Sequence, residues 1–148
     1  MTQYKQGNFA TSVGLRLEFY HNSFKLFKEH PWIGTGTGSF AQDYLAVAEN
    51  KQFATQNPHN EYLNIAVQFG LLGMVILLSL FIVHAWASFR LQGIRQYFAQ
   101  AVLVSIAVGS LFNSWLMDVT QGCFYVIFTA LLFAGLSYKS EKITFKSN

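Results

Sequence analysis

The feature that most constrains this chain is an apolar run at residues 71–87, in which His84 is the only side chain that could carry a charge. Together with residues 58–70 it predicts one long helix of roughly 45 Å at 1.5 Å per residue, enough for an interfacial section and a full membrane crossing. Only 11% of the residues are charged and 52% are hydrophobic, whereas a soluble domain carries about 25% charged residues. The sequence therefore predicts a membrane protein.

Two further apolar segments follow and predict two more crossings. The predicted spans are residues 62–87, 97–116 and 123–138. The first loop between spans carries Arg90 and Arg95 without an acidic residue, and the tail is rich in lysine, whereas the link at 117–122 has no basic residue. Because short basic segments stay in the cytoplasm, we expect an all-α membrane protein with about three transmembrane helices, its C-terminus inside and residues 1–60 outside.

Residues 12–29 predict an amphipathic helix. Its apolar residues recur at steps of four and three and form one narrow stripe, which predicts contact with a membrane surface or with other helices. The stripe comprises Val13, Leu17, Tyr20, Phe24 and Phe27. Arg16 lies at the edge of this stripe, where its guanidinium could bind a phosphate. The alternative is an arginine that snorkels from an interfacial helix.

Three glycines alternate in the segment after this helix, at Gly34, Gly36 and Gly38. Glycine permits unusual backbone angles and the close approach of a ligand, so a phosphate-binding nest is one interpretation. The segment is not a GxGxxG motif and follows no predicted strand, which argues against a nucleotide site. A plain turn with an interfacial tryptophan is the other interpretation, and a short helix is expected at residues 39–49.

The start of the long helix carries the candidate chemistry. Asn57 is predicted as the N-cap and Pro58 as the first helical residue. His59 would then lie in the first turn, where the positive end of the helix dipole favours a neutral ring that can accept a proton. The free N–H groups at the same end could bind an anion. The alternative is an ordinary capped helix with a surface histidine.

The predicted topology brings polar residues that are far apart in the chain to one membrane face. Arg16, His59, Asn113 and Asp118 all fall at the outer face. Cys123 is the only cysteine, which excludes an internal disulfide and a thiolate metal cage. The net charge of +3 is too small and too scattered for a nucleic-acid surface. We therefore expect no metal, no cofactor and no nucleic acid.

Four segments together resemble the C-terminal half of the O-antigen ligase and polymerase superfamily. They are Arg16 within a helix, the run HPWIGTGTGSF at 30–40, the run PHNEYL at 58–63 and the run GLLG at 70–73. The resemblance implies a bacterial inner-membrane glycosyltransferase that acts at the periplasmic face. Ligases of this family transfer a glycan from undecaprenyl diphosphate to a hydroxyl of the lipid A core, while relatives polymerise O-antigen units or glycosylate pilin. The choice among these three reactions stays open.

The resemblance also implies roles for individual residues. The family's essential histidine matches His59, which would accept the proton of the acceptor hydroxyl. Its essential arginine matches Arg16, which would bind the diphosphate and stabilise the charge of the leaving group. Asn60 and Glu61 could orient the ring or the acceptor. Together with the alternating glycines and the polar residues at the outer face, they give the residues expected to bind substrate, which are Asn60, Glu61, Gly36, Gly38, Asn113 and Asp118.

Members of the family resemble chains of ten or more membrane helices, whereas this chain offers three. We therefore expect a fragment of the full enzyme. Its expected partners are the undecaprenyl-diphosphate-linked glycan, a lipid A core or other glycan acceptor, the lipid bilayer, and the missing N-terminal helices as a separate chain. The alternative is a non-catalytic small membrane subunit whose helices dock on a partner.

Overall fold

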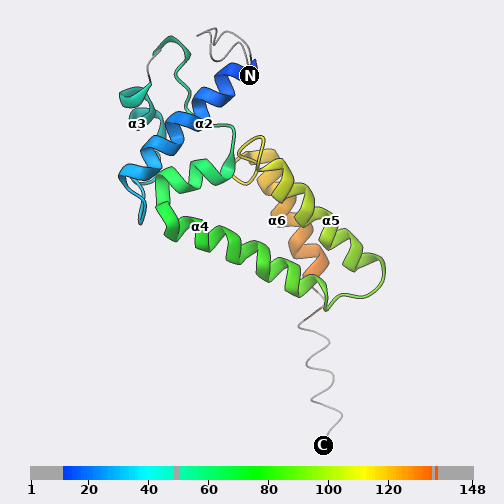
Figure 1. Cartoon of the computed structure of the whole chain (residues 1–148). Helices are drawn as coiled ribbons and strands as arrows, with labels where there is room; N and C mark the ends of the chain where they lie inside the picture. The colour runs from blue at the N-terminus through cyan, green and yellow to red at the C-terminus, as the bar shows by residue number, and fades with distance from the viewer. Residues whose placement is uncertain (1–11, 49–50, 135, 137–148) are drawn as a thin grey trace, which may run out of the picture. The chain divides into compact units, whose positions relative to one another are not determined.

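The computed structural model describes residues 12–48, 51–134 and 136, and it is all-α over that range, as predicted (Figure 1). Its five α-helices are α2 (Ser12–Glu29), α3 (Phe40–Val47), α4 (Glu61–Ser88), α5 (Ile94–Gly109) and α6 (Val119–Phe133), with a 3₁₀ turn at Lys51–Phe53. The chain forms two compact units. The first comprises Met1–Leu77 with Ser110–Ser114, and the second comprises Leu78–Gly109 with Trp115–Asn148.

Three apolar helices lie at the three predicted spans, and the second and third are shorter than predicted. Among the described residues α4 alone is long and apolar enough to cross a membrane by length and composition, and α5 and α6 are shorter apolar helices. The largest difference is that α5 ends at Gly109 rather than near residue 116. Beyond this end, the carbonyl oxygens of Ser110 and Leu111 accept hydrogen bonds from Glu61, Tyr20 and Asn60 of the first unit. The C-terminal lysines lie outside the described residues.

The first unit has a small aromatic core between α2, α3 and the start of α4. Phe19 packs edge-on against Tyr44 with ring centroids 5.9 Å apart, and Val67 of α4 is fully buried in the same cluster. Asn22 Nδ2 donates to the Tyr44 hydroxyl at 3.2 Å. Burial raises the pKa of that hydroxyl, the Asn22 hydrogen bond acts in the opposite direction, and the charge of Glu18 raises the pKa further.

The apolar stripe predicted on α2 is not the buried face of that helix. Val13 is 69% exposed and Phe24 is 50% exposed. The buried residues of α2 are Gly14, Glu18, Phe19, Asn22, Ser23 and Leu26. Tyr20 of the stripe packs against the core and Phe27 is half-buried, so the outward part of the stripe is Val13, Leu17 and Phe24. That part is open to the contact with a membrane or with other helices that the sequence predicted.

α4 is broken at Gly70, whose backbone angles (φ 62°, ψ −154°) are not helical. The loop after α2, residues 31–38, closes this break from both sides, because it bonds the last carbonyl groups before the break and the first N–H groups after it. The four hydrogen bonds are Thr35 N to Val67 O (2.9 Å), Gly36 N to Gln68 O (3.0 Å), Leu71 N to Pro31 O (2.8 Å) and Leu72 N to Trp32 O (3.2 Å). Residues 31–38 are called the glycine loop below.

Two glycines make this contact possible, one on each side. A Cβ at Gly34, where φ is 68°, would lie 2.3 Å from the backbone carbonyl carbon of Gln68. A Cβ at Gly70 would lie 2.5 Å from the carbonyl carbon of Trp32. No side chain fits at either distance. The close approach that the sequence allowed for a ligand is made here by the protein's own backbone.

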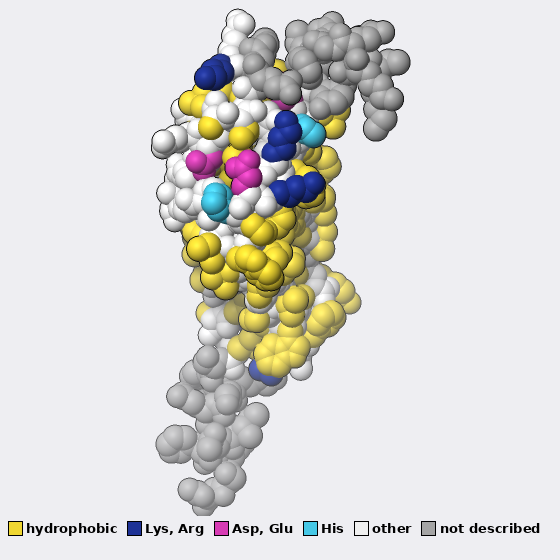
Figure 2. Space-filling model, turned by 60° about the vertical axis from the view of Figure 1, so that its left-hand side comes forward, with side chains coloured by type: hydrophobic (Ala, Val, Ile, Leu, Met, Phe, Trp, Pro, Cys, Tyr) yellow, Lys and Arg dark blue, Asp and Glu magenta, His cyan; other side chains and the backbone are white. Residues whose placement is uncertain are grey.

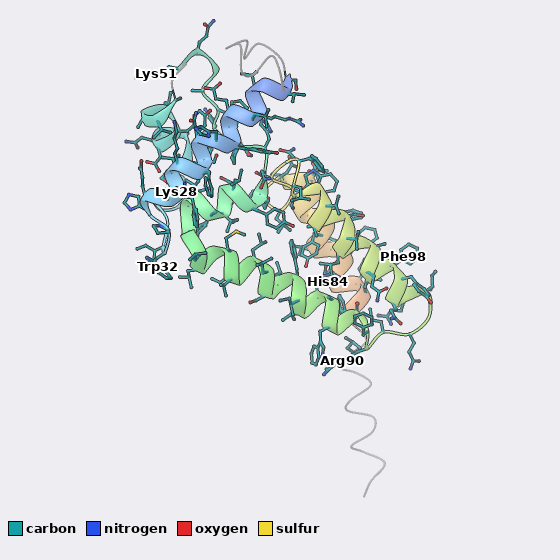
Figure 3. The ribbon with its side chains drawn as sticks, in the orientation of Figure 1. Lys28, Trp32, Lys51, His84, Arg90 and Phe98 are labelled. Carbon is teal, nitrogen blue, oxygen red and sulfur yellow. The ribbon has the colours of Figure 1, made fainter. Side chains whose placement is uncertain are left out.

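In the second unit His84 joins α4, α5 and α6 (Figure 3). The Ala99 carbonyl oxygen, 3.0 Å from Nε2, can only accept, so Nε2 carries the proton. Nδ1 then accepts from the Tyr125 hydroxyl at 3.0 Å, and the two rings stack with centroids 5.5 Å apart. With both nitrogens bonded and 4% of its surface exposed, His84 has a structural role.

Candidate functional site

The residue that caps α4 is Asn60, not Asn57 as the sequence predicted. α4 begins at Glu61, and Asn60 Oδ1 accepts a hydrogen bond from Leu63 N at 3.0 Å, which is the geometry of an N-cap side chain. His59 consequently lies in the turn before the helix rather than in the predicted first helical turn. Residues 57–60 are called the histidine turn below.

Asn57 builds the histidine turn instead of capping the helix. Its Oδ1 accepts from His59 N at 2.8 Å, which makes an Asx-turn, and from the Ser114 hydroxyl at 2.8 Å. His59 has a φ of 53° and is the only described non-glycine residue with a positive φ. A backbone held in this sparsely populated region is a feature that clusters at functional sites.

The side chain of His59 is oriented by Asn113. Asn113 Oδ1 lies 3.2 Å from His59 Nδ1, and the imidazole packs on Phe19 with ring centroids 6.1 Å apart. Because an amide oxygen can only accept, Nδ1 carries a proton in this arrangement, and in the neutral ring Nε2 then has the lone pair. Within the described part of the chain no hydrogen bond occupies Nε2. The ring is thus set up as a proton acceptor.

The loop between α5 and α6 reaches the histidine turn through its backbone carbonyl groups. Ser110 O accepts from Glu61 N at 2.8 Å, and Leu111 O accepts from Asn60 Nδ2 at 3.0 Å. Since the N–H groups of Glu61 and Leu63 are both used, the anion site predicted at this helix end loses two donors. The predicted site residues that the first unit brings together are His59, Asn60, Glu61 and Asn113.

α2 supplies the other side of the site. The Tyr20 hydroxyl donates to Leu111 O at 3.1 Å and lies 3.4 Å from His59 O. Arg16 lies one helical turn before Phe19 and Tyr20, both of which contact the histidine turn, so it shares their helix face. Its side chain is exposed, and no hydrogen bond or ion pair to another described residue holds it. The placement of its guanidinium at the diphosphate stays a prediction.

Asn60 and Glu61 are buried more deeply than a direct substrate contact would favour. Glu61 is 1% exposed and Asn60 is 8% exposed. Their position between the histidine turn and the first turn of α4 suits the alternative role that the sequence suggested, which is to orient His59. Side chains so deeply enclosed have little surface to offer a sugar.

Gly36 and Gly38, the predicted substrate contacts, lie in the glycine loop. Gly36 N donates to Gln68 O at 3.0 Å, and Gly38 N donates to Gln68 Oε1 at 2.6 Å. A phosphate nest needs free backbone N–H groups, and these two already have acceptors. The Cβ side of both glycines is open, with no described atom within 4 Å. Any substrate contact would therefore be made through that side.

Asp118 belongs to the second unit, where it is the N-cap of α6. Its Oδ1 accepts from Thr120 N at 2.9 Å, and the rest of its side chain is exposed. The expected substrate contact of Asp118 stays a prediction.

The positioning roles of Asn57, Ser114 and Tyr20 were not predicted from the sequence. Both Asn57 and Asn60 are good capping residues, and Pro58 favoured the first of them, but the hydrogen bonds from residues 110–114 decide for the second. No local pattern pointed to Ser114. The hydroxyl of Tyr20, a polar tip within an apolar stripe, was the one signal available for its role.

The family match agrees with these residues. A family model described as O-antigen ligase matches residues 1–78, more than half of the 148 residues, and the chain belongs to the O-antigen ligase family. The matched range contains Arg16, the glycine loop and the histidine turn, so the resemblance seen in the sequence is confirmed. Members of this family are inner-membrane proteins. No individual curated protein matches the chain.

Proposed function

We propose that this chain is the acceptor-activating part of a bacterial O-antigen ligase-type glycosyltransferase. It would transfer a glycan from undecaprenyl diphosphate to a hydroxyl of the lipid A core, or of a similar acceptor, at the periplasmic face of the inner membrane. The observation that carries the proposal is the orientation of His59, whose Nδ1 faces Asn113 Oδ1 while Nε2 keeps its lone pair. Family membership supports the class of reaction.

In this mechanism His59 Nε2 takes the proton of the acceptor hydroxyl as the hydroxyl oxygen attacks the anomeric carbon of the lipid-linked sugar. The bond from that carbon to the diphosphate oxygen breaks, and its electron pair leaves with undecaprenyl diphosphate. Arg16 binds the leaving diphosphate through its guanidinium fork and offsets the negative charge that develops there. No metal is part of the proposal.

α4 would cross the membrane from its break onward. The segment at residues 71–88 measures about 27 Å at 1.5 Å per residue, close to the hydrocarbon thickness of about 30 Å. Its large apolar side chains are mostly exposed, as a lipid-facing helix requires; the most exposed are Leu72, Val75, Ile76, Ile82, Val83 and Trp86. α5 and α6 would cross with the help of flanking residues. The basic loop and tail support a cytoplasmic C-terminus and a periplasmic region at residues 1–60.

Complementation of a ligase-deficient strain tests the proposal. The chain would be expressed alone and together with the N-terminal helices of a full-length family member as a separate chain. We expect surface glycan to be restored by the wild-type sequence and not by His59→Ala or Arg16→Ala at equal membrane abundance. Restoration by both variants would contradict catalysis and support the alternative of a subunit that only docks on other helices. Supplying lipid A core or a lipid-linked acceptor in vitro separates ligase from polymerase.

A further inference from the structure

The glycine loop presents two large apolar side chains to the outside of the first unit. Trp32 and Ile33 are each 73% exposed. Their backbone is nevertheless tightly held, because the hydrogen bonds that close the α4 break come from Trp32 itself and from residues on both sides of the pair. An exposed tryptophan on a fixed loop makes no contribution to the core of this unit, so its position calls for an outside partner.

One hydrogen bond fixes the position of this loop along the apolar part of α4. Leu72 N donates to Trp32 O at 3.2 Å, which places Trp32 at the first turn after the break (Figure 3). From this turn onward every exposed side chain of α4 except Ser79 is apolar, and Leu71, Leu72, Val75 and Ile76 are between 41% and 62% exposed. Trp32 and Ile33 therefore continue the apolar surface of the proposed membrane span.

Cations lie on the other side of the loop, at the end of α2. Lys25 and Lys28 are exposed, and Lys28 Nζ lies 4.6 Å from the centroid of the exposed Phe24 ring. Glu29 is the one exposed acid in the same turn. Figure 2 shows charged and histidine side chains gathered on part of this face, with a hydrophobic patch adjoining them. Lysine beside tryptophan at the edge of an apolar surface matches the phosphate and carbonyl levels of a phospholipid leaflet.

We propose that the Trp32–Ile33 tip of the glycine loop is an anchor that inserts at the boundary between headgroups and acyl chains of the periplasmic leaflet. The inference rests on the proposed membrane placement of α4 and goes beyond it, because the anchor fixes the depth of the site. Residues 61–69 span about 13 Å of helix, and the two residues from Glu61 back to His59 add at most about 3.5 Å each. His59 therefore lies within about 20 Å of the boundary, on the side where the headgroup of a lipid in the same leaflet would lie.

Depth-dependent quenching of tryptophan fluorescence tests this anchor on the full chain. The double variant Trp86→Phe/Trp115→Phe keeps Trp32 as its single tryptophan and is reconstituted in vesicles of phosphatidylethanolamine and phosphatidylglycerol. Lipids brominated near the carbonyl group should quench Trp32 at least twofold more than lipids brominated near the chain end. A matched variant, Trp32→Phe/Trp115→Phe, keeps only Trp86, which lies near the other end of the proposed span beside Arg90.

The two variants separate the failure of this inference from the failure of the proposed function. If brominated lipids quench Trp86 while aqueous iodide quenches Trp32, the span stands and the anchor is wrong. If lipids quench neither tryptophan, the membrane placement itself is wrong. As a check that does not depend on tryptophan, Ile33→Cys in a Cys123→Ser background should resist a charged, membrane-impermeant maleimide in vesicles, and rapid labelling would overturn the anchor.

Discussion

The glycine loop and the histidine turn both pack against the polar first part of α4, and the sequence marked both as candidate sites. They are built differently. The glycine loop meets α4 through backbone groups on both sides, and its glycines allow a contact too close for any side chain. The histidine turn is held by the side chains of three asparagines, Asn57, Asn60 and Asn113.

The difference decides what each segment has left to offer a substrate. In the glycine loop the N–H groups of Thr35, Gly36 and Gly38 all have acceptors on α4. In the histidine turn the asparagines occupy the backbone and one ring nitrogen of His59, and the lone pair of the other nitrogen remains. A segment held by backbone hydrogen bonds has no N–H groups left for a ligand, whereas a segment held by side chains can leave one reactive atom available. The variants below test this comparison.

The largest effect on stability is expected from Gly34→Ala or Gly70→Ala. Each adds a Cβ within 2.5 Å of an opposing backbone atom at a positive φ. The strained φ alone costs about 1–2 kcal/mol, and because neither backbone can move aside, we expect a total loss of at least about 3 kcal/mol. Thermal unfolding in detergent, followed by circular dichroism, measures it.

Gly38→Ala is the matched control for these two variants. Gly38 also has a positive φ, 78°, but a Cβ there meets no described atom within 4 Å. We expect Gly38→Ala to lower the free energy of unfolding only by the cost of its positive φ, about 1–2 kcal/mol. Equal losses of unfolding free energy for the variants at Gly34, Gly70 and Gly38 would show that the loop is not closely packed against the helix break.

Asn113→Ala should slow glycan transfer about 10–100-fold, because general-base catalysis contributes about 10²–10⁴-fold and an unoriented ring keeps part of it. The tautomer gives a readout that a purely structural role would not move. In ¹⁵N spectra of histidine-labelled protein, His59 should be protonated at Nδ1 in the wild type and become a mixture of tautomers in the variant.

Asn113→Asp tests which end of the amide faces the ring. An aspartate oxygen can still accept from Nδ1, so we expect transfer to remain within about fivefold of the wild type. If Asn113→Asp loses as much activity as Asn113→Ala, the amide nitrogen rather than the oxygen faces the ring. Nε2 would then carry the proton, and His59 could not act as the base.

A smaller effect is expected at the cap of α4. Asn60→Ala removes both the acceptor for Leu63 N and the donor to Leu111 O. Loss of an N-cap typically costs about 1 kcal/mol, and leaving the Leu111 carbonyl without this donor adds about 1 kcal/mol. Asn60→Ser keeps the capping oxygen and should lose about half as much. Equal unfolding temperatures for the two variants would mean that the cap contributes nothing.

Much of the fold could be predicted because periodicity and apolar length are local properties. The bounds of α2, residues 12–29, coincide with its helical pattern. The face that α2 buries could not be predicted in this way. An apolar stripe is reliably buried in the protein core only when the helix is surrounded by water, and it can stay exposed where the helix meets lipid or a partner. The break at Gly70 could not be predicted either. It depends on hydrogen bonds from a loop 32 or more residues upstream, and a glycine in an apolar run gives no local sign of them.

The residues of the candidate site could be predicted from the sequence, but much of their arrangement could not. Charge bias placed His59 and Asn113 at one membrane face, and the structure joins them by a hydrogen bond. The choice between Asn57 and Asn60 as the cap depends on the loop at 110–114, which lies some 50 residues further along the chain. Capping rules consider only the residues next to a helix end, so they do not include the hydrogen bonds from that loop.

The most direct test of the central claim is the initial rate of glycan transfer by His59→Ala in reconstituted membranes, measured beside His21→Ala. His21 is an exposed histidine on α2, so its variant controls for the loss of an imidazole as such. We predict that His59→Ala loses at least about 100-fold in rate with unchanged membrane insertion, and that His21→Ala stays within about twofold of the wild type. Transfer by His59→Ala at the rate of His21→Ala would contradict a catalytic role for the histidine turn.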